Sequence, residues 1–170
     1  ADGPVSPLNA VWCGHVRQRI ILPQLGHVVL VFPLGETAVI CANTSLEASQ
    51  YLMLAAVPDG QPITLGLPDP QAEAAPLLVM WLSPAFVAEL AQFLNIPENL
   101  HELLQGMPLL QGDPVSAIVA EVEAAYRAHR SPDAIEDLFL EVVGEVLRLM
   151  RLRHQTLQRL ARRRDGTTED

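Results

Sequence analysis

The sequence of 170 residues predicts an α+β fold, in which an antiparallel β-barrel or sandwich is followed by α-helices. Thirteen of the 14 prolines lie at or before Pro114, so the first two thirds of the chain are broken into short segments. Those segments are rich in β-branched and large apolar residues, whereas after Ser83 apolar residues recur every three or four positions. Strands that come first and helices that come later are typical of this fold class.

Six segments before Ser83 have the composition of strands, and each is bounded by Pro, Gly, Asn or Asp. Because no helical pattern separates them, we expect neighbouring strands to pair antiparallel. The expected strands are residues 10–22, 26–32, 36–42, 49–57, 61–67 and 76–82.

Three dipeptides that join a small polar residue to proline predict helix starts, because the side-chain oxygen caps an N–H and proline has none to cap. They are Ser83-Pro84, Asp113-Pro114 and Ser131-Pro132. We expect helices over 84–94 and 114–128, a short helix over 97–105, and a long helix from Pro132 to about Arg164. In the first helix, Phe86, Leu90 and either Phe93 or Leu94 share one face.

Charge is divided unevenly along the chain, which has a net charge of −9 and no lysine. Seven of the 11 arginines lie between Arg148 and Arg164, where the helix dipole favours cations. The last six residues have a linker composition. We therefore expect a barrel subdomain with its short helices over 1–112, a helical subdomain over 113–164, and a linker or tail over 165–170. The acidic body predicts that this chain alone does not bind DNA specifically.

No segment has the length of a membrane span or the pattern of a signal peptide, so we expect a cytoplasmic protein without membrane contact. Cys13 and Cys41 both sit among apolar residues and are expected to be buried free thiols. The five histidines form no pair at metal-ligand spacing, and no catalytic motif is present. The sequence thus predicts no enzyme activity, no metal and no cofactor.

Two groups of residues are candidates for ligand recognition. His15, Arg17 and Arg19 alternate with apolar neighbours, so they form either a wet outer strand face or a polar pocket lining. Trp12, Tyr51 and Trp81 pack in the core or form the walls of a small-molecule pocket. The candidate effector-binding residues are Trp12, Arg17, Arg19, Tyr51 and Trp81.

The long helix carries two apolar stripes, although packing on one barrel needs only one. We expect the other stripe to form a homodimer, unless the remaining C-terminal helices cover it. The candidate interface residues are Leu138, Phe139, Val142, Val143, Val146, Leu149, Met150 and Leu157.

Residues 20–160 resemble the N-terminal domain of AraC-type transcriptional regulators, most closely in "YLMLAAVPDGQPIT", "APLLVMWLSPAFVAEL" and "SPDAIEDLFLEVVGEVLRLMRLRHQ". The resemblance implies a cupin-like barrel, an effector pocket inside it and helices that dimerise. It also implies that DNA is bound by helix-turn-helix units, which this chain lacks. The resulting hypothesis is an effector-sensing and dimerisation domain. The alternatives are a small cupin-type barrel enzyme and a ligand-free dimeric interaction module.

Overall fold

The computed structural model describes residues 9–23, 26–41, 46–49, 52–56, 62–69, 71–97, 109–110 and 112–166. The described strands pair antiparallel in two sheets, ordered β1-β8-β3-β6-β9 and β2-β7-β4-β5. The strands are β1 (Ala10–Val16), β2 (Ile20–Leu22), β3 (Val28–Pro33), β4 (Val39–Cys41), β5 (Leu46–Ala48), β6 (Leu52–Ala56), β7 (Ile63–Gly66), β8 (Ala75–Leu82) and β9 (Leu109–Leu110). The α+β class is confirmed, and the cupin-like barrel stays a prediction.

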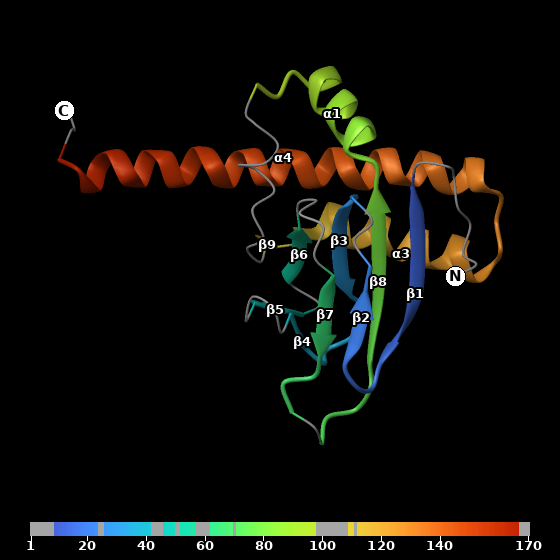
Figure 1. Cartoon of the computed structure of the whole chain (residues 1–170). Helices are drawn as coiled ribbons and strands as arrows, with labels where there is room; N and C mark the ends of the chain where they lie inside the picture. Colours follow the sequence, from blue (N-terminus) through green and yellow to red (C-terminus); the bar gives the residue numbers. More distant parts are fainter. Residues whose placement is uncertain are drawn as a thin grey trace.

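Three helices are described: α1 (Pro84–Phe93), α3 (Gly112–Arg127) and α4 (Pro132–Arg164). The helix α4 lies across one end of the sheets, and α1 lies beyond α4 (Figure 1). The helix α3 packs against the five-stranded sheet. Both α3 and α1 contact α4, and α3 also contacts β1. The molecule is therefore layered, with the five-stranded sheet between the helices and the four-stranded sheet.

The middle strands of the five-stranded sheet are buried on both faces. In β8, Leu78 and Met80 point into the core shared with the helices, whereas Leu77 and Val79 point into the core between the sheets. All six residues of β3 are buried in the same way. This arrangement explains why both strands read as continuous apolar runs without polar alternation.

The predicted strand over residues 10–22 was wrong in one respect, because it is two strands that belong to different sheets. Residues 10–16 pair with β8, and residues 20–22 pair with β7. Between them, residues 17–19 bend the chain from one sheet to the other. The short strands β5 and β9 were not predicted, since two or three residues carry no readable period.

The helix starts follow the predicted dipeptides at two of the three positions. Pro132 begins α4, and the Ser131 hydroxyl accepts a hydrogen bond from the Ala134 N–H at 3.3 Å. At the start of α1 the Ser83 side chain forms no cap; instead the Ser83 N–H donates to Asn9 Oδ1 at 2.9 Å. The helix α3 begins at Gly112, one residue before the expected cap. Of the expected helix over 97–105, residues 98–105 lie outside the described residues.

The long helix α4 divides into a covered part and an uncovered part. Apart from Leu140, which is 42% exposed, its large apolar side chains are buried or partly buried as far as Met150. Beyond that residue, Leu152, Leu157 and Leu160 are 60%, 50% and 50% exposed. The C-terminal half extends past the sheets (Figure 1). None of the described helices combines the length and apolar content needed to cross a bilayer.

Candidate functional site

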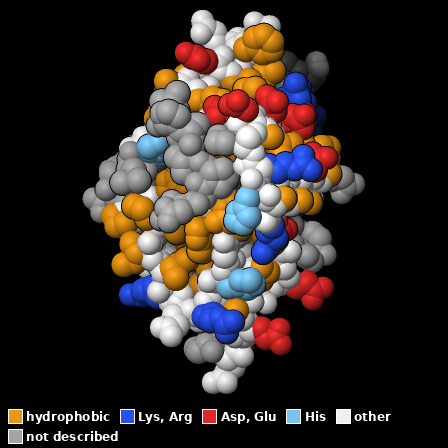
Figure 2. All heavy atoms as spheres, turned by 90° about the vertical axis from the view of Figure 1, so that its right-hand side faces the viewer, with side chains coloured by type: hydrophobic (Ala, Val, Ile, Leu, Met, Phe, Trp, Pro, Cys, Tyr) orange, Lys and Arg blue, Asp and Glu red, His pale blue; other side chains and the backbone are white. Residues whose placement is uncertain are grey.

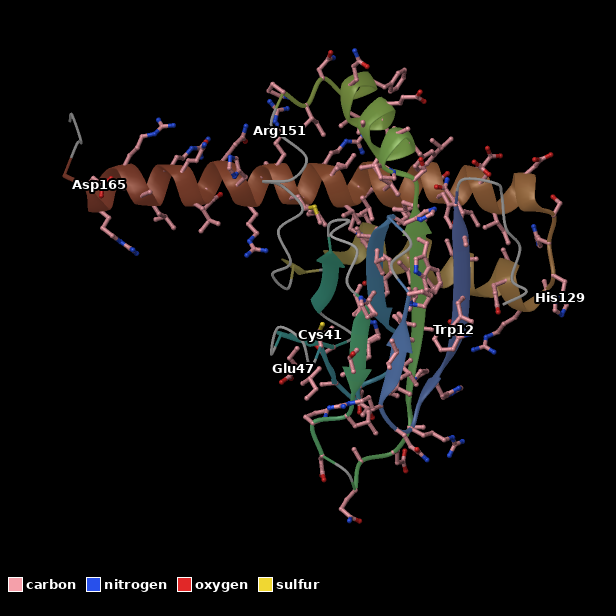
Figure 3. All side chains as sticks on the ribbon, in the orientation of Figure 1. Trp12, Cys41, Glu47, His129, Arg151 and Asp165 are labelled. Atoms are coloured by element: carbon pink, nitrogen blue, oxygen red, sulfur yellow. The ribbon has the colours of Figure 1, made fainter. Side chains whose placement is uncertain are left out.

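Trp12 and Trp81 lie on the same face of neighbouring strands. The register pairs Ala10 with Trp81 and Trp12 with Val79, so the two tryptophans are diagonal neighbours. Both are partly buried and pack against the core between the two sheets. Figure 3 shows Trp12 on β1. The structure therefore brings together two of the five predicted effector-binding residues.

Gly14 makes room for the indole of Trp12. The two residues lie two positions apart on one strand and therefore face the same way. A Cβ atom added at Gly14 would come within 3.0 Å of three ring atoms of Trp12. The indole thus lies along the strand over Gly14, a position that a larger residue at Gly14 would block.

Trp81 also connects the two sheets. Its indole N–H donates a hydrogen bond of 2.6 Å to the backbone carbonyl of Pro23, directly after β2. Because β8 belongs to the five-stranded sheet and β2 to the four-stranded sheet, this bond holds their neighbouring ends together.

The predicted polar residues lie at the connection between the sheets. Arg17 and Arg19 belong to the bend between β1 and β2, and both are exposed, as is His15 at the end of β1. The bend replaces the single strand face on which these three residues were expected to alternate. Tyr51 lies outside the described residues. The two arginines are thus exposed at the end of β1 that pairs with Ala75, whereas Trp81 pairs with Ala10 at the other end of the strand.

The opposite face of β1 carries Cys13, which is half-buried against the helices. Burial, followed by the nearby Glu123 carboxylate, raises the pKa of the Cys13 thiol to about 11, and the Arg127 guanidinium opposes this shift. Glu123 and Arg127 form an ion pair of 2.9 Å along α3. A thiol with such a pKa is protonated and a poor nucleophile at neutral pH. Cys41 is also outside any disulfide and is buried.

Most of the predicted dimer residues are buried by other parts of the same chain. Five of the eight are buried in the core that α4 shares with the sheet and the other helices. These five are Phe139, Val142, Val143, Val146 and Met150. Leu138 and Leu149 are partly buried against the same core, and Leu157 is exposed. Up to Met150, therefore, elements of the same chain cover both stripes.

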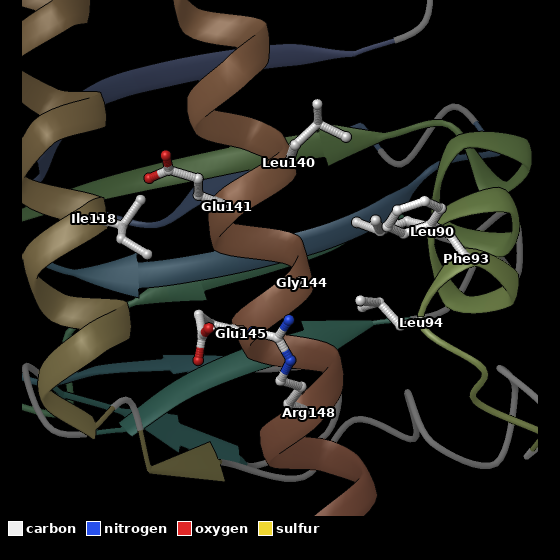
Figure 4. A pocket seen from close by; sticks show the side chains of 9 residues that line it. All are labelled: Leu90, Phe93, Leu94, Ile118, Leu140, Glu141, Gly144, Glu145 and Arg148. Atoms are coloured by element: carbon white, nitrogen blue, oxygen red, sulfur yellow. Dashed lines mark hydrogen bonds and ion pairs between the residues drawn. The ribbon is translucent and has the colours of Figure 1, made fainter.

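A groove that the sequence did not predict lies over the outer side of α4, between α1 and Ile118 of α3 (Figure 4). It encloses about 330 Å³, and an ion pair between Glu145 and Arg148 lies at its edge. The lining residues are Leu90, Phe93, Leu94, Ile118, Leu140, Glu141, Gly144, Glu145 and Arg148. The sequence left open whether Phe93 or Leu94 shares the apolar face of α1. Leu94 is partly buried whereas Phe93 is 80% exposed, so Leu94 is the residue on that face. The sequence feature that could have indicated this groove is Gly144, a glycine inside a long helix.

Within the described part of the chain, no three or more His, Cys, Asp or Glu residues are close enough to hold a metal ion. The arrangement there offers apolar surfaces with a few charged groups at their edges. Such surfaces suit the binding of a ligand or a partner.

No protein-family model matches the chain, and no curated protein matches it. Solved structures of ToxT from Vibrio cholerae do share its fold. Apo ToxT aligns with a TM-score of 0.61 at 11% identity, over 84% of this chain and 55% of ToxT. ToxT bound to (E)-4-(8-methylnaphthalen-1-yl)but-3-enoic acid aligns with a TM-score of 0.52 at 14% identity, over 84% and 57%. ToxT bound to an unsaturated fatty acid aligns with a TM-score of 0.50 at 12% identity, over 89% and 58%. The chain thus spans a little over half the length of these structures.

Proposed function

We propose that this chain is the regulatory, effector-sensing domain of an AraC-type transcription regulator. The observation that carries the proposal is the fold shared with ToxT over 84% of the chain. ToxT is an AraC-family regulator, and the matched region covers its N-terminal effector-binding domain. The cupin-like closure of the two sheets belongs to this proposal. We assign no catalytic role, because the compared proteins are transcription regulators.

The effector we propose is a molecule with an apolar body and a carboxylate. Two of the compared ToxT structures hold such compounds, a butenoic acid with an aromatic group and an unsaturated fatty acid. In this chain, Trp12 and Trp81 offer apolar walls beside the core between the sheets. Arg17 and Arg19 lie where the chain passes between the sheets, and arginine forms strong charge-assisted hydrogen bonds with carboxylates. Tyr51 lies outside the described residues and stays a predicted member of this site.

Intrinsic fluorescence tests this function directly, because Trp12 and Trp81 are the only tryptophans in the chain. Oleic acid, titrated below its micelle concentration, is expected to change the emission saturably. Replacing Arg17 and Arg19 together with Gln should weaken binding about tenfold, which corresponds to ~1.4 kcal/mol. Arg130→Gln, an exposed charge in the turn after α3, serves as the control. An emission that does not saturate would reject an apolar carboxylate as effector and favour a ligand-free interaction module.

We also propose a homodimer formed by the uncovered end of α4. At 3.6 residues per turn, Leu157 and Leu160 continue the stripe that Phe139 and Val146 begin. Beyond Met150 the described chain offers no core against this stripe, so a second copy is the proposed cover. Sedimentation at high micromolar concentration should show a dimer that Leu157→Asp combined with Leu160→Asp dissociates. A monomeric parent protein would refute the dimer.

We propose that DNA recognition does not reside in this chain. The arginines at the end of α4 stand where a helix favours cations, and the body of the chain is acidic. A mobility-shift assay at physiological salt should therefore show no specific complex. A specific complex that is lost when Arg162, Arg163 and Arg164 are replaced with Gln would reassign DNA binding to this helix end.

A further inference from the structure

Gly144 lies near the middle of α4, in the groove between α4 and α1 (Figure 4). Glycine inside a helix is less stable than alanine, because it has more backbone freedom to lose. The packing of the described residues does not require glycine here. The nearest atom to an added Cβ is Leu94 Cδ1 at 3.9 Å, which is ordinary van der Waals contact. Among the described residues, Leu94 is thus the nearest side chain to an added Cβ, and the space over Gly144 is otherwise open.

The walls of this space are apolar and unusually exposed. Phe93 is 80% exposed and Leu140 is 42% exposed, while Leu90 and Leu94 are partly buried behind them. Large apolar side chains that adjoin one another at the surface mark contact sites. The volume of about 330 Å³ is roughly twice the ~150 Å³ cavity that holds a benzene ring. The groove can thus take more than one large side chain of a partner.

Charges at the groove select a cationic occupant. Arg148 is already paired with Glu145, which leaves the exposed Glu141 as the other carboxylate that lines the groove, on the side of Ile118 (Figure 4). Two further exposed acids lie one helical turn away: Asp137 precedes Glu141 on α4, and Glu89 precedes Phe93 on α1. Glu141 in the groove and these two acids near it are not balanced by Arg148, which pairs with Glu145, so the apolar floor complements a helix that carries both apolar and basic side chains.

We propose that the groove between α1 and α4 binds a basic amphipathic helix of a partner protein. Two apolar side chains one turn apart on that helix pack over Gly144 between Phe93 and Leu140, and a lysine or arginine lies beside Glu141. Gly144 lets the partner backbone approach α4 closely, as small residues do at helix crossings. This interaction is separate from effector binding, since the groove lies on the far side of α4 from the sheets (Figure 4).

A second copy of this chain is a poorer occupant. Of its described helices, the basic one is the end of α4, whose exposed Leu157 continues the stripe that faces the core. Gly144 lies on the opposite side of the same helix. Two straight α4 helices related by a two-fold axis meet through one face of each, so they cannot seat both leucine stripes in both grooves.

A defined peptide tests the groove without knowledge of the natural partner. The probe is a fluorescein-labelled amphipathic peptide of leucine and lysine, about five helical turns long, titrated by anisotropy at about 0.15 M salt. Gly144→Leu fills the groove without changing charge and should weaken binding at least tenfold. Gly66→Leu is the matched control, because Gly66 on β7 also has open space around it. It should bind within a factor of two of the parent protein.

Two further variants test the physical premises. Gly144→Ala should raise the Tm by roughly 2–4 °C, because alanine has the better helix propensity, and should still weaken peptide binding. Glu141→Gln should weaken peptide binding more than the control Glu47→Gln, which removes an exposed acid on β5. The proposal fails if the parent protein does not bind the peptide, or if Gly144→Leu binds it equally well. Self-association that Gly144→Leu abolishes would also overturn it and assign the groove to a second copy. These outcomes do not depend on the oleic acid titration.

Discussion

The indole N–H of Trp81, in the five-stranded sheet, donates a hydrogen bond to the carbonyl oxygen of Pro23, which directly follows β2 of the four-stranded sheet. The bond joins positions 58 residues apart in the sequence. It fixes the Trp81 ring beside the core between the sheets, where the effector site is proposed. The stability of the sheet pair and the geometry of this site therefore depend on the same hydrogen bond.

Replacing Trp81 with Phe should lower the free energy of unfolding by about 1–2 kcal/mol, because the Pro23 carbonyl loses its donor and some apolar area is lost. Urea denaturation followed by circular dichroism measures this change. Trp12→Phe removes a similar ring from the same face, with no such bond described, and should cost about 1 kcal/mol less. Equal losses in the two variants would show that the hydrogen bond contributes nothing.

Gly14→Ala should displace the Trp12 indole, since the new methyl group would overlap the ring. We expect a loss of about 1–3 kcal/mol, the usual cost of overpacking. In a Trp81→Phe background, the fluorescence of Trp12 alone should shift toward that of an exposed indole. Gly66→Ala, where an added Cβ meets nothing within 4 Å, controls for the general effect of replacing glycine. An unchanged Trp12 spectrum would mean that the ring does not lie over Gly14.

The Cys13 thiol should react slowly with iodoacetamide at pH 8, because its pKa is raised to about 11 and the thiolate is scarce. With Cys41 replaced by Ala, the rate should rise steadily from pH 8 toward pH 11. The unfolded chain, with an ordinary thiol pKa of 9.0, releases the proton more readily, so this group's contribution to stability is complete below pH 9 and declines above it. Glu123→Gln should accelerate the reaction. A rate that levels off near pH 9 would contradict the raised pKa.

Phe139→Ala should destabilise the folded chain by about 3–5 kcal/mol, because Phe139 is only 1% exposed within the core under α4. Leu152→Ala, on the uncovered half of the same helix, should change stability by no more than about 0.5 kcal/mol. Thermal unfolding at low protein concentration separates the two cases. A mild effect of Phe139→Ala on unfolding, together with loss of a dimer, would place Phe139 at an interface between copies.

Local chemistry let the sequence predict the helices and most strands. Ser131 and Pro132 mark the start of α4 because capping and the missing proline N–H act within a single turn. The Gly144 groove could not be predicted, since Phe93 and Leu140 lie on different helices and only packing shows that both remain uncovered.

The sequence by itself determined the α+β class, the order of strands before helices and the bounds of α4, because these depend on local periods and caps. Only the tertiary structure decided which apolar residues of α4 are covered by other elements of the same chain. The stripe of Phe139 and Val146 is identical in pattern to its continuation at Leu157, yet the sheet and the other helices cover the first and end before the second. The break at residues 17–19 was decided in the same way. A strand changes sheet where its partners change, and partners distant in the sequence leave no trace in a local pattern.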